Sequence, residues 1–261
     1  FIGKIVVANS TIINNQGVGI VENQPDNAVT ILRNSIVAGN ITSLIGPDCN
    51  GSLISQGYNI LGKTTYCDIT ATTGDQFNID PKLGAFLPML GYHPLRPNSP
   101  AINHGNSATC PATDQRGVPR DKCDIGAYEY TIPGSASQVL LFSGDNQNVG
   151  PGKRFTPLAV AAVDAIGSPV PGVAVTFTLP ASGASAVFDT THTNTMSTVT
   201  NAVGVASSLG LVANSENGEF SAEAMSDSLG LITFHLRIET WYLSAGGNDA
   251  TRLPVLRRRR V

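Results

Sequence analysis

The sequence predicts an all-β fold in two parts, a short stack of parallel β-helix coils followed by a β-sandwich. Only 13% of the 261 residues are charged and 6% are aromatic, whereas Gly (27) and Pro (16) are plentiful. This composition favours short strands joined by many turns over helices. A repeat of about 25 residues at the N-terminal end and a series of period-two segments after residue 136 predict the two parts separately.

An Asn followed by a short β-branched run recurs three times in the first sixty residues. The three asparagines are Asn9, Asn34 and Asn59. One coil of a parallel β-helix produces such a spacing, with equivalent residues stacked along the axis. We expect Ile12, Val37 and Leu61 to form an apolar column inside the coils. The asparagines are expected at corners with positive φ, where their amides bond to the neighbouring coils.

A coil stack needs closing at both ends, because an open end coil exposes an unpaired strand edge and an open core. The coils are expected to occupy residues 1–62, and the first coil to meet upstream sequence or another molecule. Residues 63–130 are irregular and rich in Pro, so we expect them to form the cap at the other end.

The four cysteines are Cys49, Cys67, Cys110 and Cys123. An even number at moderate spacing predicts disulfides formed in an oxidising compartment. A zinc site fits poorly, because no CxxC occurs and the four His are scattered. Three connectivities are open. Pairing of sequence neighbours, which closes loops of about 13 to 18 residues, is the one we expect.

Three motifs follow one another between residues 79 and 130. Residues 79–84 read IDPKLG, residues 97–106 read PNSPAINHGN and residues 113–130 read TDQRGVPRDKCDIGAYEY. Together they resemble the closing region of the choice-of-anchor family, type Q, at the end of right-handed β-helices on secreted bacterial surface proteins. The resemblance implies that residues 1–132 are right-handed coils and their cap, in an exported structural protein. His104 departs from the pattern, because the family has Ala there.

The last of these motifs carries the richest charged cluster of the chain. Its members are Asp114, Arg116, Arg120, Asp124 and Glu129. One interpretation is a calcium or glycan site. The other is an ionic network that holds the loops of the cap and satisfies its turn amides. Because Cys110 and Cys123 lie beside the cluster, we favour the structural network and predict no metal and no cofactor.

Residues 136–238 contain about seven short apolar runs at intervals of about ten residues, which predicts an Ig-like β-sandwich. Val173, Val175, Phe177 and Leu179 lie on one face of such a strand at period two. Residues 239–261 continue past this pattern, and their membership of the sandwich is open. They include the run Arg257–Arg260, which we interpret as a solvated tail; binding to an anionic surface is the alternative.

Two segments of this second part resemble the bacterial Ig-like domains of invasin and intimin type. The first segment is a strand–turn–strand motif. The second, further along the chain, is a hairpin with Thr, Gly and Ala at fixed spacing. The matching positions are Asp164, Gly167, Pro169, Val170, Gly172, Val173, Val175, Phe177, Thr200, Gly204 and Ala206. The resemblance implies a spacer or adhesive unit without a core disulfide, which agrees with the absence of Cys after Cys123.

Enzymatic and membrane functions find little support in the sequence. Polysaccharide lyases and hydrolases built on a β-helix need clustered carboxylates, but Glu22, Asp26 and Asp48 do not recur at the coil period. His104 and His235 are isolated and no nucleophile elbow appears. No apolar run reaches the roughly 18 residues that span a bilayer. The start lacks Met and a signal-peptide pattern, so we expect a mature product or a fragment.

The sequence therefore predicts a non-catalytic structural or adhesive protein, secreted or on a bacterial cell surface. Expected partners are further copies, in a homo-oligomer or head-to-tail filament, and a surface glycan or host protein. The net charge of −3 gives no reason to expect nucleic acid. A polysaccharide-degrading enzyme is one alternative. The other is a carbohydrate-binding module, which requires an exposed aromatic strip; only Tyr58, Tyr66 and Tyr92 are candidates.

Overall fold

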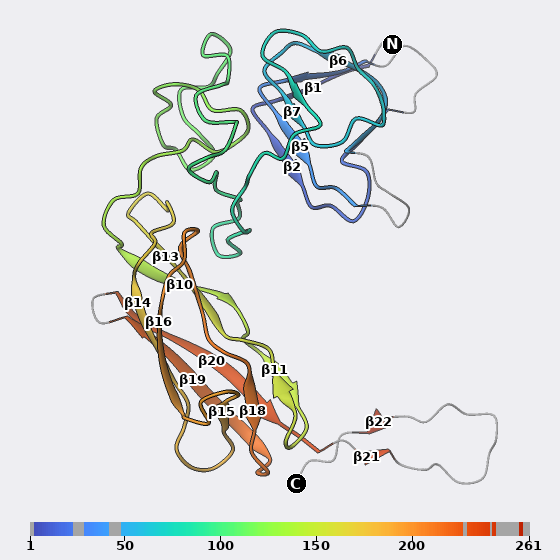
Figure 1. Ribbon diagram of the computed structural model, residues 1–261. Coiled ribbons are helices and arrows are strands. Elements are labelled where there is room, and N and C mark those ends of the chain that lie inside the picture. The colour runs from blue at the N-terminus through green and yellow to red at the C-terminus, as the bar shows by residue number, and fades with distance from the viewer. Residues whose placement is uncertain are drawn as a thin grey trace, which may run out of the picture. The chain divides into compact units, whose positions relative to one another are not determined.

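The computed structural model describes residues 3–22, 29–41, 48–226, 229–240, 242–243 and 256–257. The chain divides into two compact units, Phe1–Ile132 with Ile166–Ser168, and Pro133–Ala165 with Pro169–Val261. The described residues form strands and no helix, which confirms the all-β class (Figure 1). Most of the uncertain tail, including Arg258–Arg260 of the arginine run, lies outside the described residues.

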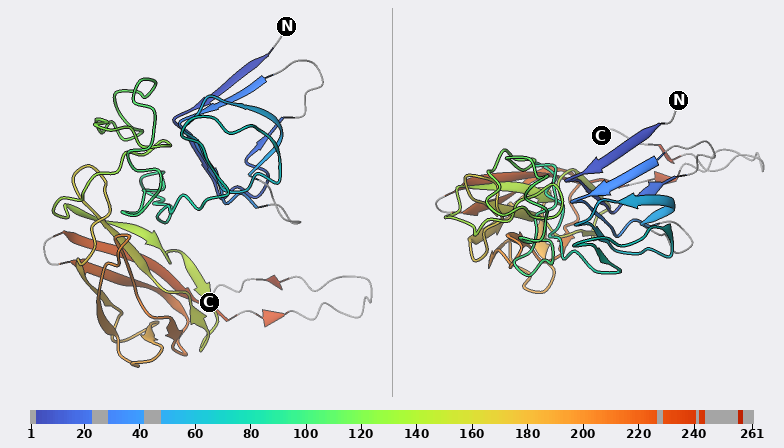
Figure 2. Two further views of the ribbon diagram at one scale, coloured as in Figure 1. Left: turned by 45° about the horizontal axis from the view of Figure 1, so that its top comes forward. Right: turned by 90° about the horizontal axis from the view of Figure 1, so that it is seen from above.

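The first unit begins with stacked parallel strands (Figures 1 and 2). One sheet has the order β1-β4-β6-β3, with β8 also paired to β6, and another has the order β2-β5-β7-β9. Its strands are β1 (Lys4–Ala8), β2 (Thr11–Ile13), β3 (Ile20–Val21), β4 (Val29–Arg33), β5 (Ile36–Ala38), β6 (Cys49–Ser55), β7 (Ile60–Leu61), β8 (Tyr66–Asp68) and β9 (Gln76–Phe77).

The strand register follows the predicted repeat at the first step only. Thr11 pairs with Ile36, 25 positions further along the chain, whereas Ile36 pairs with Ile60 after 24 positions and Ile60 with Gln76 after 16. Successive turns of the chain therefore become shorter. Parallel pairing continues through β8 and β9 as far as Phe77. Parallel pairing therefore extends past residue 62, the expected last residue of the coils.

In the sheet β2-β5-β7-β9, the side chains of the two central strands, β5 and β7, are covered on both faces. Ile12, Val37 and Leu61 are in register and pack in the apolar core of the coils, as the repeat predicts. Ile36 alternates to the opposite face and is nevertheless fully buried. The cap covers it there, because Gly126 approaches so closely that a Cβ would lie 2.9 Å from the end of the Ile36 side chain. The cap thus packs on the outer face of this sheet.

The corner asparagines only partly follow the prediction. Asn9 and Asn34 have φ of 47°, but at the third corner Tyr58 takes the positive φ (59°) in place of Asn59. Asn59 is fully buried and its Oδ1 accepts a hydrogen bond from the main-chain N–H of Ser35 at 3.1 Å. It therefore ties two coils together, as expected, without occupying the left-handed region itself.

The second unit contains three sheets that share one apolar core. Their orders are β10-β13-β17, β11-β20-β19-β14-β16 and β12-β18-β15. The strands are β10 (Gln138–Ser143), β11 (Gln147–Val149), β12 (Arg154–Phe155), β13 (Ala159–Val163), β14 (Ala174–Thr178), β15 (Ala186–Phe188), β16 (Thr195–Val199), β17 (Val205–Ser207), β18 (Leu211–Ala213), β19 (Gly218–Ser226) and β20 (Gly230–Ile238). A short pair, β21 (Tyr242–Leu243) and β22 (Leu256–Arg257), follows them.

Residues of the Ig-like sequence motif fix the turn between β13 and β14. The Thr200 hydroxyl donates to Val170 O at 2.7 Å and accepts from the N–H of Val173 at 2.9 Å. Gly204 has φ of 73° and lies so close to Pro169 that a Cβ would approach its ring to 2.6 Å. The spacing of these residues in the sequence therefore reflects one packed turn. Ile166–Ser168, within the same motif, group instead with the first unit.

Candidate functional site

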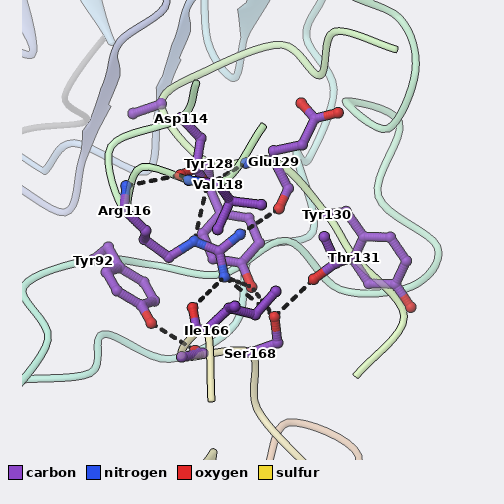
Figure 3. A network of polar contacts seen from close by, with 12 residues as sticks. Tyr92, Asp114, Arg116, Val118, Tyr128, Glu129, Tyr130, Thr131, Ile166 and Ser168 are labelled. Carbon is purple, nitrogen blue, oxygen red and sulfur yellow. Dashed lines mark hydrogen bonds and ion pairs between the residues drawn. The ribbon is translucent and has the colours of Figure 1, made fainter. Parts of the chain in front are cut away.

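The five charged residues predicted in the cap meet in one network of buried side chains, and Figure 3 shows the part of it around Arg116. Arg116 Nε lies 2.8 Å from Asp114 Oδ2, and Arg120 Nη1 lies 3.0 Å from Glu129 Oε2. Asp124 joins through its N–H, which donates to the same Glu129 oxygen at 3.0 Å. The sequence motif thus predicted the members of the cluster, and the structure gives their bonds.

Asp114 holds the loops of the cap through main-chain donors. Its carboxylate accepts hydrogen bonds from the N–H groups of Arg116 (2.7 Å), Val118 (3.1 Å) and Glu129 (3.0 Å). Burial acts to raise the pKa of Asp114. The main-chain donors and the Arg116 guanidinium outweigh burial and hold the pKa below its usual value. The charged carboxylate therefore holds together two segments of the cap, the one around Arg116 and Val118 and the one at Glu129.

Arg116 stacks on Tyr128, with its guanidinium carbon 3.7 Å from the ring centroid. Its Nη2 donates to Glu129 O at 2.6 Å, and its Nη1 donates to Ile166 O and Ser168 Oγ, each at 3.2 Å (Figure 3). These bonds attach the segment Ile166–Ser168 to the first unit. The guanidinium donors are directed at protein atoms, which is the arrangement of a scaffold.

Arg120, Tyr92 and Asp124 form the remaining part of the network. Arg120 donates to Asp124 O at 3.2 Å and to Gly126 O at 2.9 Å, so it holds the loop that covers the β2-β5-β7-β9 sheet. Burial raises the pKa of Tyr92 to about 12, and its hydroxyl donates to Gly167 O at 2.6 Å. Burial also raises the pKa of Asp124, although main-chain N–H groups and Arg120 oppose this.

Glu129 makes the stability of the cap depend on pH. Burial raises its pKa from 4.5 to about 7, because desolvation outweighs the ion pair with Arg120. A raised carboxyl pKa means that the folded state binds the proton more tightly, so the contribution of Glu129 to stability is fully present below pH 4.5 and is lost as pH rises through 7. We expect a loss on the order of 2 kcal/mol across this window.

Urea unfolding at a series of pH values measures this loss, and Glu129→Gln is expected to flatten the profile because the amide does not ionise. Asp121→Asn is the matched control, since the Asp121 side chain is exposed in the same cap. An unchanged slope in Glu129→Gln contradicts the assignment.

The disulfides join Cys49 to Cys67 and Cys110 to Cys123, which is the pairing of sequence neighbours. The first links β6 to β8, and the second closes a loop that contains Asp114, Arg116 and Arg120 of the ionic network. Their sequence separations are 18 and 13 residues. Both lie in the first unit, so the second unit holds its core without a cross-link.

Removal of the cap disulfide by Cys110→Ala with Cys123→Ala is expected to lower stability by about 3 kcal/mol, because the unfolded chain regains the entropy of a 13-residue loop. Urea unfolding under oxidising conditions measures the loss. Dithiothreitol supplies the control: the double variant must respond less to the reductant than the parent protein does. Equal midpoints for parent and variant would show that the cross-link adds nothing.

The other candidates from the sequence are structural or isolated. Asp48 is buried and accepts from the N–H groups of Asn40 (2.8 Å) and Lys63 (2.7 Å), so it fastens two turns. His104 is exposed, and His235 lies 3.3 Å from Asp145 on the second unit. Asp26 lies outside the described residues. Within the described ranges, no group of three or more His, Cys, Asp or Glu is placed to hold a metal ion.

A cleft that the sequence did not indicate lies between β2 and the cap loops of the first unit. Its volume is about 630 Å³, and it is lined by Asn14 and Asn15 after β2 and by Phe86, His93 and Gln115 from the cap. These residues come from three distant segments, and Gln115 alone among them belongs to a motif, that of residues 113–130. An exposed aromatic beside a Gly-containing turn is the signal that the sequence offered at Phe86.

The tyrosines proposed as a sugar-binding strip do not form one. Tyr92 is buried, Tyr58 is half-buried, and only Tyr66 is exposed, at 58%. Tyr92 is instead committed to the cap network through its bond to Gly167. A carbohydrate-binding face built on these three residues is therefore ruled out.

No protein-family model matches the chain, and no curated protein matches it. Solved structures with partial similarity include the D00-D0 domain of intimin (12% identity, 44% of this chain and 54% of that chain, TM-score 0.29). The Escherichia coli adhesin FdeC is 14% identical over 48% of this chain and 40% of that chain, with a TM-score of 0.27. A glycosyl hydrolase family 2 member from Bacteroides cellulosilyticus is 15% identical over 46% of this chain and 16% of that chain, with a TM-score of 0.34. The chain thus spans between 16% and 54% of these chains. These TM-scores are too low to establish a shared fold.

No helix in the described part of the chain is long and apolar enough to cross a membrane.

Proposed function

We propose that the chain is a non-catalytic structural and adhesive part of a secreted or cell-surface bacterial protein. The observation that carries the proposal is the construction of the cap. A disulfide closes one of its loops, and the side chains of the buried ionic network form hydrogen bonds with the protein's own main chain. Such a cap preserves shape. Disulfides form and persist in oxidising, extracytoplasmic settings, which supports an extracellular location.

The finer assignment of the two units belongs to the same proposal. Residues 1–132 are the end of a right-handed parallel β-helix with its cap, and residues 136–238 are an Ig-like β-sandwich. The parallel registers of β1, β4 and β6 support the first assignment. The packed turn around Thr200 and Gly204 supports the second. Together they give a stiff coil end joined to a spacer.

Assembly into a filament or matrix is a more specific version of this function. Among the described residues, β1 and β16 stand at the ends of the strand orders of their sheets, and Ile5 on β1 is 60% exposed. Strands at the end of a sheet accept further strands, so these two strands are the contacts we propose between copies. Strict monomers at high concentration contradict the assembly but leave the surface role standing.

Two experiments test the proposal. Immunogold electron microscopy of the native cells asks whether the protein lies on the surface or in extracellular material, as we expect. Release of reducing or unsaturated ends from pectin and alginate tests the competing polysaccharide-degrading function. Turnover above a heat-denatured control overturns the non-catalytic proposal, and an intracellular location overturns the surface role.

A further inference from the structure

We propose that the cleft between β2 and the cap binds a neutral saccharide, with Phe86 and His93 as its stacking platform. The inference rests on the proposed adhesive function and names the ligand class for it. The cleft volume of about 630 Å³ lies within the range of small-molecule sites in proteins. Every residue that lines it belongs to the first unit.

Phe86 is the exposed ring of the aromatic platform, whereas His93 is half-buried and its ring plane is tilted by 45° to that of Phe86. Phe86 is 46% exposed, and its ring centroid lies 5.2 Å from that of His93. His93 Nδ1 lies 3.0 Å from Gly84 O, and since a carbonyl only accepts, this nitrogen carries the hydrogen. The bond fixes the imidazole orientation and leaves Nε2 as the second polar atom of the ring. The C–H face of a pyranose packs on such a surface.

Side-chain amides supply the polar part of the cleft. Asn14, Asn15 and Gln115 are all exposed. Asn15 donates its Nδ2 to Asn40 Oδ1 at 2.8 Å, which fixes the amide and leaves its own Oδ1 as an acceptor. An amide offers both donors and acceptors, and so do the hydroxyls of a sugar. Exposed amides beside an aromatic ring therefore match a polyhydroxylated ring with one apolar face.

Charge selects against other ligands. No Asp, Glu, Lys or Arg is among the described residues that line the cleft. An anionic polymer or phosphate group needs cations, and a metal ion needs carboxylates. An uncharged ligand with many hydroxyl groups is the class that remains, whether it is a microbial or plant polysaccharide or an animal-type glycan.

Saturation-transfer difference NMR and calorimetric titration of the full chain test the inference. One arm uses cello-, xylo- and manno-oligosaccharides, and the other uses lacto-series and high-mannose oligosaccharides, which separates the two sources. We expect binding in one arm. Phe86→Ala and Gln115→Ala should each weaken it by about tenfold, the effect of one lost stacking or bidentate contact.

Met89→Ala is the control, because Met89 is 62% exposed on the same cap loop and does not line the cleft. It should bind as the parent does. Hydrogen exchange of the cap checks that Phe86→Ala remains folded. The inference is overturned by no binding in either arm, by preference for alginate or heparin, or by equal binding to Phe86→Ala. Surface location without saccharide binding overturns this inference alone, whereas turnover overturns the proposed function.

Discussion

Replacement of Arg116 by Ala is expected to lower the free energy of unfolding of the first unit by about 3–5 kcal/mol, the usual loss when one partner of a buried ion pair is removed. The Arg116 and Asp114 side chains are 5% and 0% exposed, so the carboxylate would stay buried without its cation. Glu129 O and Ser168 Oγ would also lose their guanidinium donors. Urea unfolding followed by circular dichroism measures the loss.

Two variants separate the effect of the hydrogen-bond network on stability from the effect of a positive charge alone. Arg96→Ala removes an exposed arginine of the same cap and should change stability by less than about 0.5 kcal/mol. Arg116→Lys keeps the charge and loses the planar fork, so we expect it to restore less than half of the loss. Hydrogen exchange should rise in peptides that cover residues 110–130 and 166–168. A loss below about 1 kcal/mol in Arg116→Ala contradicts the network.

The membership of this network was predictable from the sequence, but its reach was not. One motif of eighteen residues carries all five charged groups, and the cysteines beside them favoured a structural role. Ser168, by contrast, lies 52 positions from Arg116. No local sequence pattern predicts this partner, because the bond between Arg116 and Ser168 depends on the position of the turn that follows β13. The sequence therefore predicted the cluster and missed its longest-range bond.

The coil stack shows a similar limit. The spacing of Asn9 and Asn34 predicted the 25-residue register and the inward column that contains Val37. Later turns become shorter because the segments between strands lose residues, while the inward positions keep their apolar character. β9 is only Gln76–Phe77, which is too short to show any alternation. The positive φ at Tyr58 likewise follows from the shortened turn and not from residue preference.

In the second unit, periodicity found the strands that bury one face. β14, whose Val175 and Phe177 the period-two pattern placed on one face, alternates between more buried and more exposed residues, and so do β19 and β20. β11, β12 and β15 were missed, since each has only two or three residues. Their pairing with longer strands defines them. The cleft beside β2 was missed for a related reason: its residues converge only after the cap has folded onto β2.

Phe177→Ala is expected to lower the free energy of unfolding of the second unit by about 3–5 kcal/mol, the range for truncating a buried Phe. Phe177 on β14 is fully buried, and its ring centroid lies 6.4 Å from that of Phe234 on β20. Its cross-strand partners are Met196 and Ala224, so a cavity there would touch three strands of one sheet.

Hydrogen exchange of peptides from β14, β19 and β20 measures this effect within the second unit. Met225→Ala is the matched control, because Met225 is 49% exposed on β19 and its truncation opens no internal cavity. Its cost should stay below about 0.5 kcal/mol. The second unit has no disulfide among its described residues, so its fold depends on this apolar core. Near-equal losses for the two variants would mean that the period-two face does not hold the sheets together.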